Sequence, residues 1–541
     1  MPDRPDARWL DLNLRSLADA LQSPLPPPSP DGIWRLAGTA DAPQLQVVTA
    51  GGQPVSAHST RGPQIEADRW IDRELSGRPM PRLAIVIGAG LGYALDALIR
   101  RSPDVHVLVI EPDPSGAYAL LSCRDWRDPI RRRRLLVLAG PDYTGAAQAW
   151  RVIPEEPAQP LVLVHPVLAR EHPGLVRAAT PVMSRVLADA AANRAAADTF
   201  GRTYLLNTIE NLPAIVREPD VVALADLHRG VPAIVAAAGP SLDDAIASLK
   251  TFGTRAVLIS VDTALRPLVA HGLDPHFVVA VDPGERNARH LVDLPVHCAS
   301  RLVAEASVHP RVARAFAGRT FYFSIGSNDP WPWLARHGVV RGSLRAWGSV
   351  LISALDLAVR LGCDPILIVG ADLAYSGGQP YARGTTYEDD WAGEISHGSR
   401  LAEIWARQAN QPGALEIEGI GGERVSTLPH LVRFRDRLAG EIAALRERAI
   451  NCSGRGILLG DGVPLGTLAD QLKKHPELSG LRELAERIGL STTDRRRERA
   501  SLLAALDDAG EIAALCALAG EEYAARVHAA VAVARSGLTS E

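Results

Sequence analysis

The sequence predicts an α/β protein that contains two successive doubly wound parallel sheets followed by a helical region. The first observation is that strand-length apolar runs, such as RLAIVI at 82–87 and PAIVAAAG at 232–239, alternate with glycine turns and helical segments in two series. Buried parallel strands that alternate with helices are typical of doubly wound α/β domains. The second observation is the composition. Of the 541 residues, 47% are hydrophobic and 22% are charged, which is typical of globular proteins and excludes disordered, collagen-like and coiled-coil chains.

The first part of the chain is expected to hold three segments. Residues 1–80 combine a proline-rich run at 24–30 with short alternating apolar and polar pieces, which predicts a small irregular or β-rich opening module. Residues 81–175 carry four buried strand runs and predict a Rossmann-like α/β domain; the runs are RLAIVI, HVLVIEPDP, LLVLAG and PLVLVHP. Residues 176–229 are rich in Ala and Leu without strand signals and predict a helical connector.

The second α/β series predicts a central domain at 230–430. Its expected strands end near polar or glycine residues and lie in PAIVAAAG, RAVLISVDTAL, DPHFVVAVDP, RLVAEASV, TFYFSIG and CDPILIVGADLAY. From about residue 431 to residue 541, apolar residues recur at helical spacing, which predicts a helical carboxyl-terminal region.

Charge and cysteine content narrow the function classes. The 58 Lys and Arg residues against 62 Asp and Glu residues give a net charge of −4, so we expect no nucleic-acid partner. Five scattered cysteines without a C-x-x-C pair predict neither a disulfide framework nor a zinc site. The amino terminus lacks the apolar stretch of a signal peptide, and no long apolar window predicts membrane insertion. We therefore expect a cytoplasmic protein.

The glycine cluster GAGLG at 88–92 follows one predicted strand and precedes a helix. Its glycines Gly88, Gly90 and Gly92, with Glu111 at the end of the next strand, fit an accessory nucleotide site in which the acid accepts hydrogen bonds from a ribose. The G-x-G-x-G spacing resembles that of S-adenosylmethionine methyltransferases more than the dinucleotide fingerprint. The alternative is a tight strand-to-helix turn without a ligand.

A second turn, Gly239-Pro240-Ser241-Leu242, lies at the start of the central domain. Glycine permits a close backbone approach, and Ser241 can act as a helix N-cap and as a hydroxyl donor to an anion at the positive end of the helix. The turn therefore predicts a phosphate site, and the alternative is a plain capped helix.

Three more strand ends carry carboxylates: Asp262, Asp282 and Asp372. In open α/β sheets, ligands bind beyond the carboxyl ends of the strands, so these acids are expected to share one crevice with Ser241. The alternative for each acid is an ordinary N-cap. The run Glu388-Asp389-Asp390 is interpreted as a solvated acidic turn rather than as a divalent-ion site.

Several segments resemble the motility-associated flagellin glycosyltransferase (Maf-like) family, whose central region belongs to the hydroxymethylpterin pyrophosphokinase-like superfamily. The resemblance rests on residues 232–250, 256–283 and 347–384, with further similarity at GAGLGYAL, VIEPDP and 418–434.

The central region is also similar to bacterial sialyltransferases that use CMP-activated sugars, which implies a sialyltransferase-like fold for it. In that family a GPS turn binds the nucleotide and two tyrosines contact the leaving phosphate. The matching tyrosines are Tyr375 and Tyr381, whose hydroxyls can stabilise the departing CMP without a metal ion. Packing at the edge of the crevice is their alternative role. The resemblance places the donor-binding residues at Gly239, Pro240, Ser241, Leu242, Asp262, Thr263, Asp282, Ser349 and Gly370.

A general base must take the proton from the acceptor hydroxyl. His397 resembles the sialyltransferase base in context, and Asp282 and Asp372 are rival candidates.

The expected function is transfer of a nonulosonic (sialic-acid-like) sugar from a CMP donor to Ser or Thr hydroxyls of flagellin, with no cofactor and no metal. Two alternatives remain: a Mg-ATP-dependent pyrophosphokinase acting on a pterin-like molecule, and a non-catalytic flagellin-binding protein.

Overall fold

The computed structural model describes most of the chain. The described residues are 7–21, 25–28, 30–39, 42–140, 143, 149, 152–153, 160–294, 298–325, 328–346, 349–486, 488 and 492–540. Positions 24, 29, 326, 347 and 348 of the segments discussed above lie outside the described residues. The chain divides into two compact units, Met1–Thr199 and Phe200–Glu541, and the division falls inside helix α7 (Pro173–Arg217).

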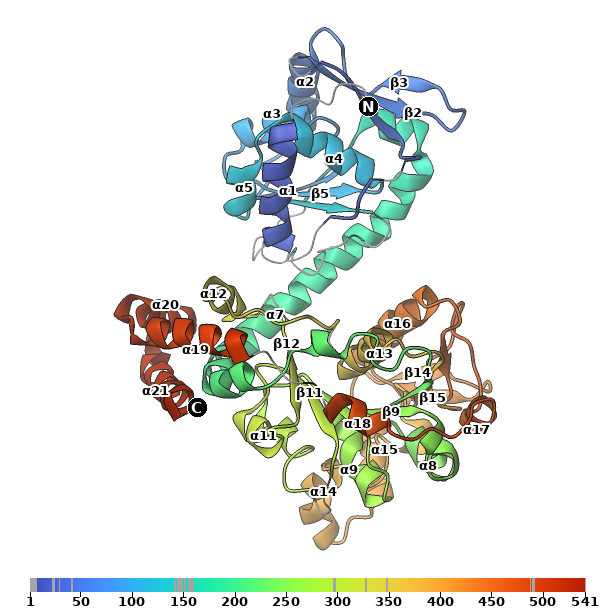
Figure 1. Ribbon diagram of the computed structural model, residues 1–541. Helices are drawn as coiled ribbons and strands as arrows, with labels where there is room; N and C mark the ends of the chain where they lie inside the picture. Colours follow the sequence, from blue (N-terminus) through green and yellow to red (C-terminus); the bar gives the residue numbers. More distant parts are fainter. Residues whose placement is uncertain are drawn as a thin grey trace. The chain divides into compact units, whose positions relative to one another are not determined.

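The first unit contains a four-stranded parallel sheet in the order β6-β5-β4-β7 (Figure 1). Its strands coincide with the four predicted apolar runs and are β4 (Leu83–Ile87), β5 (His106–Glu111), β6 (Leu135–Ala139) and β7 (Leu161–Val164). The helices that accompany it are α3 (Tyr93–Arg101), α4 (Pro114–Cys123), α5 (Arg127–Arg131) and α6 (Pro166–Glu171). Most side chains of these strands are buried, which explains their uninterrupted apolar sequence.

The opening segment forms a small antiparallel sheet with a helix on either side of it in sequence. Its elements are α1 (Ala7–Leu21), β1 (Trp34–Gly38), β2 (Pro43–Val48), β3 (Pro54–Ser56) and α2 (Pro63–Leu75). Leu17, Val47 and Ile71 belong to the same buried core as Leu83 and Val107 of the parallel sheet. The opening segment therefore shares its buried core with the α/β domain.

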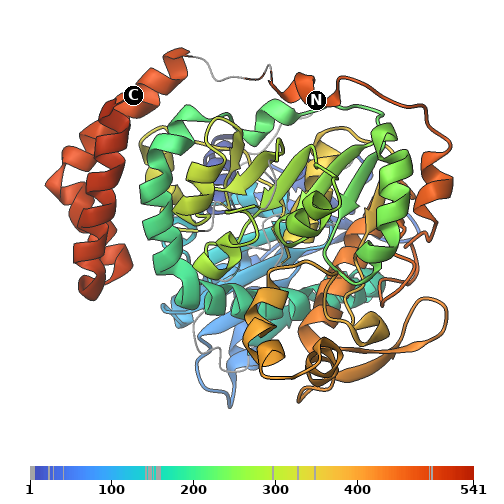
Figure 2. The same cartoon turned by 90° about the horizontal axis from the view of Figure 1, so that it is seen from below.

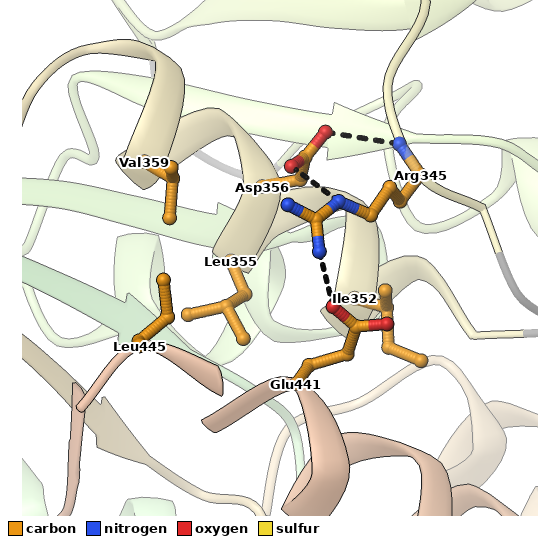
Figure 3. Close-up of a pocket in the computed structure, with 7 residues that line it drawn as sticks. All are labelled: Arg345, Ile352, Leu355, Asp356, Val359, Glu441 and Leu445. Carbon is orange, nitrogen blue, oxygen red and sulfur yellow. Dashed lines mark hydrogen bonds and ion pairs between the residues drawn. The ribbon is translucent and has the colours of Figure 1, made fainter. Parts of the chain in front are cut away.

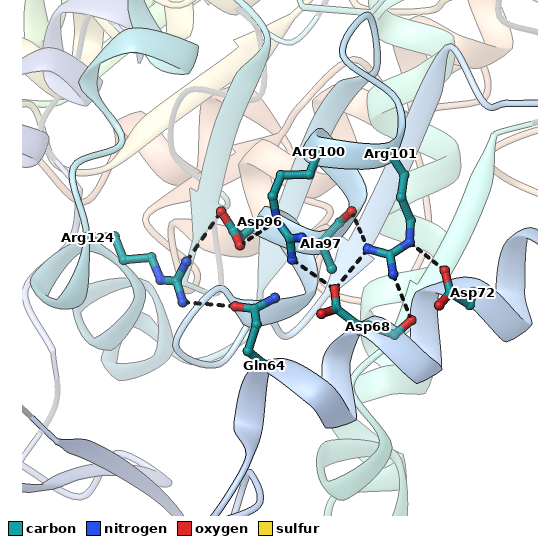
Figure 4. A network of polar contacts seen from close by, with 8 residues as sticks. All are labelled: Gln64, Asp68, Asp72, Asp96, Ala97, Arg100, Arg101 and Arg124. Atoms are coloured by element: carbon teal, nitrogen blue, oxygen red, sulfur yellow. Dashed lines mark hydrogen bonds and ion pairs between the residues drawn. The ribbon is translucent and has the colours of Figure 1, made fainter.

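A network of ion pairs joins α2 to α3 on the surface of the first unit (Figure 4). Asp68 of α2 accepts hydrogen bonds from Arg100 at 2.8 Å and from Arg101 at 2.9 Å, and Arg101 also pairs with Asp72 at 2.5 Å. On α3 itself, Arg100 pairs with Asp96 at 3.1 Å. Exposed ion pairs of this kind contribute little individually to the free energy of unfolding. The network links α2 to α3 through Asp68 and Asp72.

The second unit contains a seven-stranded parallel sheet in the order β12-β11-β10-β9-β8-β13-β16. Its strands are β8 (Ala233–Ala236), β9 (Val257–Val261), β10 (Phe277–Ala280), β11 (Arg301–Glu305), β12 (Thr320–Phe323), β13 (Ile366–Val369) and β16 (Ala449–Asn451). Strands β9 to β12 extend from β8 in one direction, whereas β13 and β16 extend in the other. The order therefore reverses between β8 and β13, and such a switch point is where open α/β sheets bind ligands.

Helices and one hairpin complete the second unit. The helices are α8 (Ser241–Phe252), α9 (Asp262–Ala270), α10 (Glu285–Ala288), α11 (Pro310–Ala315), α12 (Trp331–Arg336), α13 (Val350–Arg360), α14 (Tyr387–Ser396), α15 (Leu401–Ala409), α16 (Pro429–Ala444), α17 (Leu468–Leu472) and α18 (Leu481–Glu486). Strands β14 (Leu415–Glu418) and β15 (Arg424–Thr427) form the antiparallel hairpin.

The carboxyl-terminal region is helical, as predicted, apart from β16. Helices α19 (Thr492–Asp507), α20 (Ala509–Ala519) and α21 (Ala524–Ser540) share a buried core with α7, in which Leu502, Leu515 and Val527 join Leu205 and Ile209. Figure 2 shows these helices beside α7. None of the described helices combines the length and apolar character that a bilayer crossing requires. The predicted α/β fold class is confirmed.

Candidate functional site at the switch point

The ends of β8 and β13 are tied together at the switch point by the Gly239–Ser241 turn. The Gly239 N–H donates to the Gly370 carbonyl at 2.7 Å. The Ser241 N–H and hydroxyl donate to one carboxylate oxygen of Asp372, at 3.1 and 2.5 Å. The structure therefore brings together four of the predicted site residues.

Asp372 takes the capping role that the sequence analysis assigned to Ser241. Pro240 occupies the N-cap position without a side-chain hydrogen bond, and Ser241 is the first helical residue of α8. Burial raises the pKa of Asp372, and the hydrogen bonds from Ser241 oppose that rise. Because Asp372 is fully buried and lies at the amino end of α8, it shapes the turn and stabilises the positive end of the helix.

Glycine is required at two positions where the strand ends approach each other. A Cβ atom on Gly239 would lie 2.4 Å from a carboxylate oxygen of Asp372 and 2.5 Å from the Gly370 carbonyl oxygen. Gly370 has a φ of +70°, and a Cβ there would lie 2.1 Å from the Ala237 carbonyl oxygen. Leu242 is buried in the core of the second unit. The turn thus depends on the packing of β8 against β13.

Two acids stand at the ends of the next strands. Asp262 begins α9 and is 3% exposed; it accepts hydrogen bonds from the Thr263 N–H at 2.7 Å and the Thr263 hydroxyl at 3.0 Å. Its other oxygen accepts from the Asn287 amide at 2.7 Å. Burial raises the pKa of Asp262, and the charge of Asp282 adds to that rise, so the two acids lie within electrostatic range. Asp282 is exposed and accepts from the Gly284 N–H at 2.7 Å.

Tyr381 lies against a third tyrosine that the sequence analysis did not single out. The rings of Tyr381 and Tyr387 are stacked, with centroids 4.3 Å apart and an interplanar angle of 15°. Burial raises the pKa of both phenols, and the charge of Asp262 acts on each of them. Tyr375 is buried and accepts a hydrogen bond from the Gln411 amide at 2.9 Å. Its pKa is raised by burial, with a contribution from Tyr381. Tyr381 and Tyr387 therefore lie within electrostatic range of Asp262.

A buried histidine supports this aromatic pair and was also missed. His290 is 2% exposed, its Nδ1 lies 2.8 Å from the Thr386 hydroxyl, and its ring centroid is 5.3 Å from that of Tyr387. Burial lowers the pKa of His290 to about 4, so the imidazole is neutral at physiological pH. The recurrence of tyrosine through 375–387 was the one available signal, because a ring stack leaves no motif in the sequence.

Two predicted site residues have local roles in the structure. His397 is exposed at the carboxyl end of α14, where its Nδ1 lies 2.7 Å from the Gly393 carbonyl oxygen. Ser349 accepts a hydrogen bond from the Leu351 N–H at 3.4 Å as the N-cap of α13. Within the described residues, no hydrogen bond joins either of them to Asp262 or Asp372.

The acidic run at the start of α14 is partly neutralised. Asp390 pairs with Arg286 and with Arg289, each at 2.7 Å. These arginines and burial act in opposite directions, and the arginines dominate, so the pKa of Asp390 falls to about 2. Across the described part of the chain, no three His, Cys, Asp or Glu side chains are grouped as metal ligands would be.

A pocket between α13 and α16 is lined by none of the predicted site residues (Figure 3). Arg345 enters it and pairs with Asp356 at 3.0 Å and with Glu441, while Leu355 and Leu445 form part of the apolar wall. Arg345 therefore links an acid of α13 to an acid of α16.

The glycine loop of the first unit is covered by the protein's own side chains. A Cβ atom on Gly90 would lie 2.5 Å from the His58 Nε2, and that same nitrogen accepts the Leu91 N–H at 3.1 Å. A Cβ on Gly88 would lie 2.7 Å from Leu168, and one on Gly92 would lie 2.5 Å from Trp126. The loop is therefore packed as a tight turn, and His58 comes from the opening segment.

We expect Gly90→Ala to lower the stability of the first unit. The residue has a φ of +57°, and the added Cβ would force the His58 ring to move, which typically costs about 1–3 kcal/mol. Thermal melting of the two proteins measures the change. Gly77→Ala is the matched control, because Gly77 has a φ of +72° with no atom within 4 Å of its Cβ position. Equal losses in both variants would show that packing around Gly90 is unimportant.

Glu111 is fully buried behind this loop, and one of its oxygens accepts the Ala89 N–H at 2.6 Å. Its other oxygen has no hydrogen-bond partner among the described residues. Burial raises the pKa of Glu111 to about 8, against an ordinary value of 4.5. The predicted ribose-binding carboxylate is therefore protonated at neutral pH.

The raised pKa of Glu111 predicts a specific pH dependence of stability. Between about pH 4.5 and about pH 8 the folded chain holds a proton that the unfolded chain has lost, so stability falls as pH rises, by at most ~1.4 kcal/mol per pH unit. We expect Glu111→Gln to remove this fall, as measured by melting temperatures across that range. His58 and His165, whose pKa values burial lowers to about 4 and about 3, act in the opposite direction in both proteins. Parallel pH curves for the two proteins would contradict the prediction.

Comparison with known proteins shows similarity to a solved structure, to an uncharacterised protein and to a family model. A solved structure, that of the MAf glycosyltransferase from Magnetospirillum magneticum AMB-1, aligns with 99% of this chain and 91% of its own, at 17% identity and a TM-score of 0.43. An uncharacterised protein of Treponema pallidum (strain Nichols) is 27% identical over 194 residues, which are 36% of this chain; the alignment spans 65% of that protein's length. The 6-hydroxymethylpterin diphosphokinase MptE-like family model matches residues 206–378. The central region, including the Gly239–Ser241 turn and Tyr375, is thus similar to the MptE-like family, as its sequence predicted.

Proposed function

We propose that this protein is a glycosyltransferase that moves a nonulosonic, sialic-acid-like sugar from a CMP-activated donor to serine or threonine hydroxyls of flagellin. The observation that carries the proposal is the hydrogen bond from the Ala382 N–H, next to Tyr381, to the Ala238 carbonyl, next to the Gly239–Ser241 turn, at the switch point of the seven-stranded sheet. Phenols suit a phosphate that leaves with negative charge. The positive end of α8, where Ser241 donates to Asp372, lies next to the segment that carries Tyr381 and favours an anion nearby.

The proposed reaction breaks the bond between the sugar's anomeric carbon and the CMP oxygen, and forms a bond from that carbon to the acceptor oxygen. Tyr381 and Tyr375 donate hydrogen bonds to the departing phosphate, whose charge grows as the bond breaks. Asp262 and Asp282 orient the donor, with Thr263 holding the Asp262 carboxylate. These groups act without a metal ion.

The acceptor proton passes to a general base, for which we propose His397 with Asp282 as the rival. When the Nδ1 of His397 donates to the Gly393 carbonyl, the Nε2 carries the lone pair that can accept a proton. Asp372 is the weaker rival because its carboxylate is buried and engaged by Ser241.

A ligand screen tests the proposal. Thermal melting is measured with CMP, CTP, S-adenosylmethionine and ATP, the last with and without Mg²⁺. A ligand at about 100 times its dissociation constant adds ~2.7 kcal/mol of stability, so CMP is expected to raise the melting temperature clearly. Transfer is then followed as the mass added to flagellin from a CMP-nonulosonic acid, with and without EDTA. Stabilisation by Mg-ATP alone, with no mass added to flagellin, would overturn the proposal.

The second candidate function is a Mg-ATP-dependent pyrophosphokinase acting on a pterin-like molecule. The observation that favours it is the match of residues 206–378 to the diphosphokinase family model. It requires a divalent ion, so the dependence on Mg²⁺ and sensitivity to EDTA distinguish the two functions.

A further inference from the structure

The segment that carries Tyr381 is fastened to the start of α8 by a single carboxylate. Asp243, in the first turn of α8, accepts a hydrogen bond from the Arg383 N–H at 3.1 Å and another from the Gln379 side-chain amide at 3.1 Å. The same Gln379 amide also donates to the Tyr381 carbonyl at 2.8 Å. Asp243 therefore binds Gln379 and Arg383, which lie on either side of Tyr381 in the sequence.

A backbone contact completes this attachment. The Ala382 N–H donates to the Ala238 carbonyl at 2.8 Å, next to Gly239 of the turn. The segment from Gln379 to Arg383 thus runs along the turn and cannot move relative to it without breaking these contacts. Its direction also decides where the Tyr381 ring stacks on Tyr387.

The neighbouring acid on the helix behaves differently. Asp244 is exposed and pairs with Arg455 at 2.7 Å on the surface. An acid in the first turn of a helix is stabilised by the helix dipole wherever it points, so the dipole does not account for the hydrogen bonds of Asp243 with Gln379 and Arg383. Two adjacent acids with different partners provide a matched pair for experiment.

We propose that Asp243 is a positioning residue, which holds the segment Gln379–Arg383 so that the Tyr381 hydroxyl stands beside the nucleotide-binding turn. The consequence for turnover rests on the proposed function, because Tyr381 assists the leaving group only in that reaction. Asp243 itself touches neither donor nor acceptor in this scheme. Removal of the Asp243 carboxylate is expected to leave the Gly239–Ser241 turn intact but to let the Tyr381 side chain move.

Transfer kinetics test the proposal. Asp243→Ala is expected to lower kcat about 10- to 100-fold with the donor KM within about twofold, because displacement of a reacting group by about 1 Å costs about that much. Asp243→Asn keeps one oxygen for the Arg383 N–H and should recover part of the rate. Asp244→Ala is the control and should match the wild type. A raised donor KM at unchanged kcat would instead show that Asp243 binds the donor.

A double-mutant cycle distinguishes positioning from general destabilisation. If Asp243 acts through Gln379, then Gln379→Ala lowers kcat, and the double variant is no slower than Asp243→Ala alone. Gln379→Ala also removes the same link without altering α8, so the proposal stays testable if Asp243→Ala fails to fold. If the kcat losses of the two single variants instead add up in the double variant, Asp243 does not act through Gln379, and the proposal is overturned.

A measurement that needs no turnover separates this proposal from the proposed function. The nine tyrosines are replaced by 3-fluorotyrosine, and the ¹⁹F signal of residue 381 is assigned by its absence in Tyr381→Phe. Asp243→Ala is expected to shift and broaden that signal, whereas Asp244→Ala leaves it unchanged. An unaltered signal in Asp243→Ala would overturn the proposal. A shifted signal in a protein without transfer activity would leave the positioning role standing and reject the proposed function.

Discussion

Replacement of Tyr381 by phenylalanine is expected to lower the transfer rate about 10²- to 10³-fold with little change in donor affinity. Removing one preorganised donor to a developing negative charge typically costs ~2.7–4 kcal/mol of transition-state stabilisation. The phenylalanine ring keeps the stack on Tyr387, although it loses the hydrogen bond between the two phenols. Steady-state transfer rates and calorimetric CMP affinities measure the two quantities, and EDTA should leave the wild-type rate nearly unchanged.

Tyr523→Phe is the control for this substitution, because Tyr523 lies in the helical carboxyl-terminal region and stacks with Arg202 rather than with a site residue. If EDTA stops the reaction and Tyr381→Phe has no effect, the pyrophosphokinase function replaces the transferase. Loss of transfer in Tyr381→Phe with unchanged flagellin binding argues against a non-catalytic binding protein.

Gly239→Ala is expected both to abolish CMP binding and to destabilise the second unit. The added Cβ would displace the Asp372 carboxylate and the Gly370 carbonyl, which lie 2.4 and 2.5 Å from its position. Overpacking of this kind costs about 1–3 kcal/mol, and the turn would lose the geometry that receives a phosphate. The melting temperature without CMP, and its shift with CMP, report the two effects separately.

Gly253→Ala, at the other end of α8, is the matched control. No atom lies within 4 Å of its Cβ position, so its stability and CMP binding should equal those of the wild type. A Gly239→Ala variant that binds CMP normally would show that the nucleotide does not use this turn.

The fold followed from the sequence wherever a strand was buried on both faces. Runs such as LAIVI and ILIV are apolar without alternation because helices cover both sides of a parallel sheet, and each became a strand. The short strand β16 was not predicted, because the three residues AIN carry no periodic signal and are defined as a strand by their pairing with β13. The helix α1 was missed although Leu10, Leu14, Leu17 and Leu21 recur at helical spacing, because residues 1–80 were interpreted from their proline-rich run and their short alternating pieces.

The sequence predicted those site residues that lie at the carboxyl ends of strands, but not the contacts between them. The approach of Ser241 to Asp372 follows from the adjacency of β8 and β13, which sequence order does not reveal because the strands are separated by four others along the chain. Tyr387 contacts the Tyr381 ring within its own segment and the His290 ring from a distant one, and neither ring contact is marked by a motif. The glycine loop of the first unit shows the converse case, in which a motif predicted a site that the structure fills. Its spacing is compatible with a nucleotide, but the His58 side chain packs against Gly90, and no motif connects His58 to the loop.

The position of β16 at the margin of the seven-stranded sheet bears on how the second unit can be produced in isolation. A fragment that ends near residue 430 would retain the predicted domain 230–430 yet lack β16, leaving the backbone edge of β13 unpaired. An apolar strand with an open edge promotes aggregation through pairing with other chains. It would also lack Leu468 and Leu472, which are buried in the same core. A fragment intended for ligand binding therefore has to extend beyond α17, so that it contains both β16 and the buried leucines of α17.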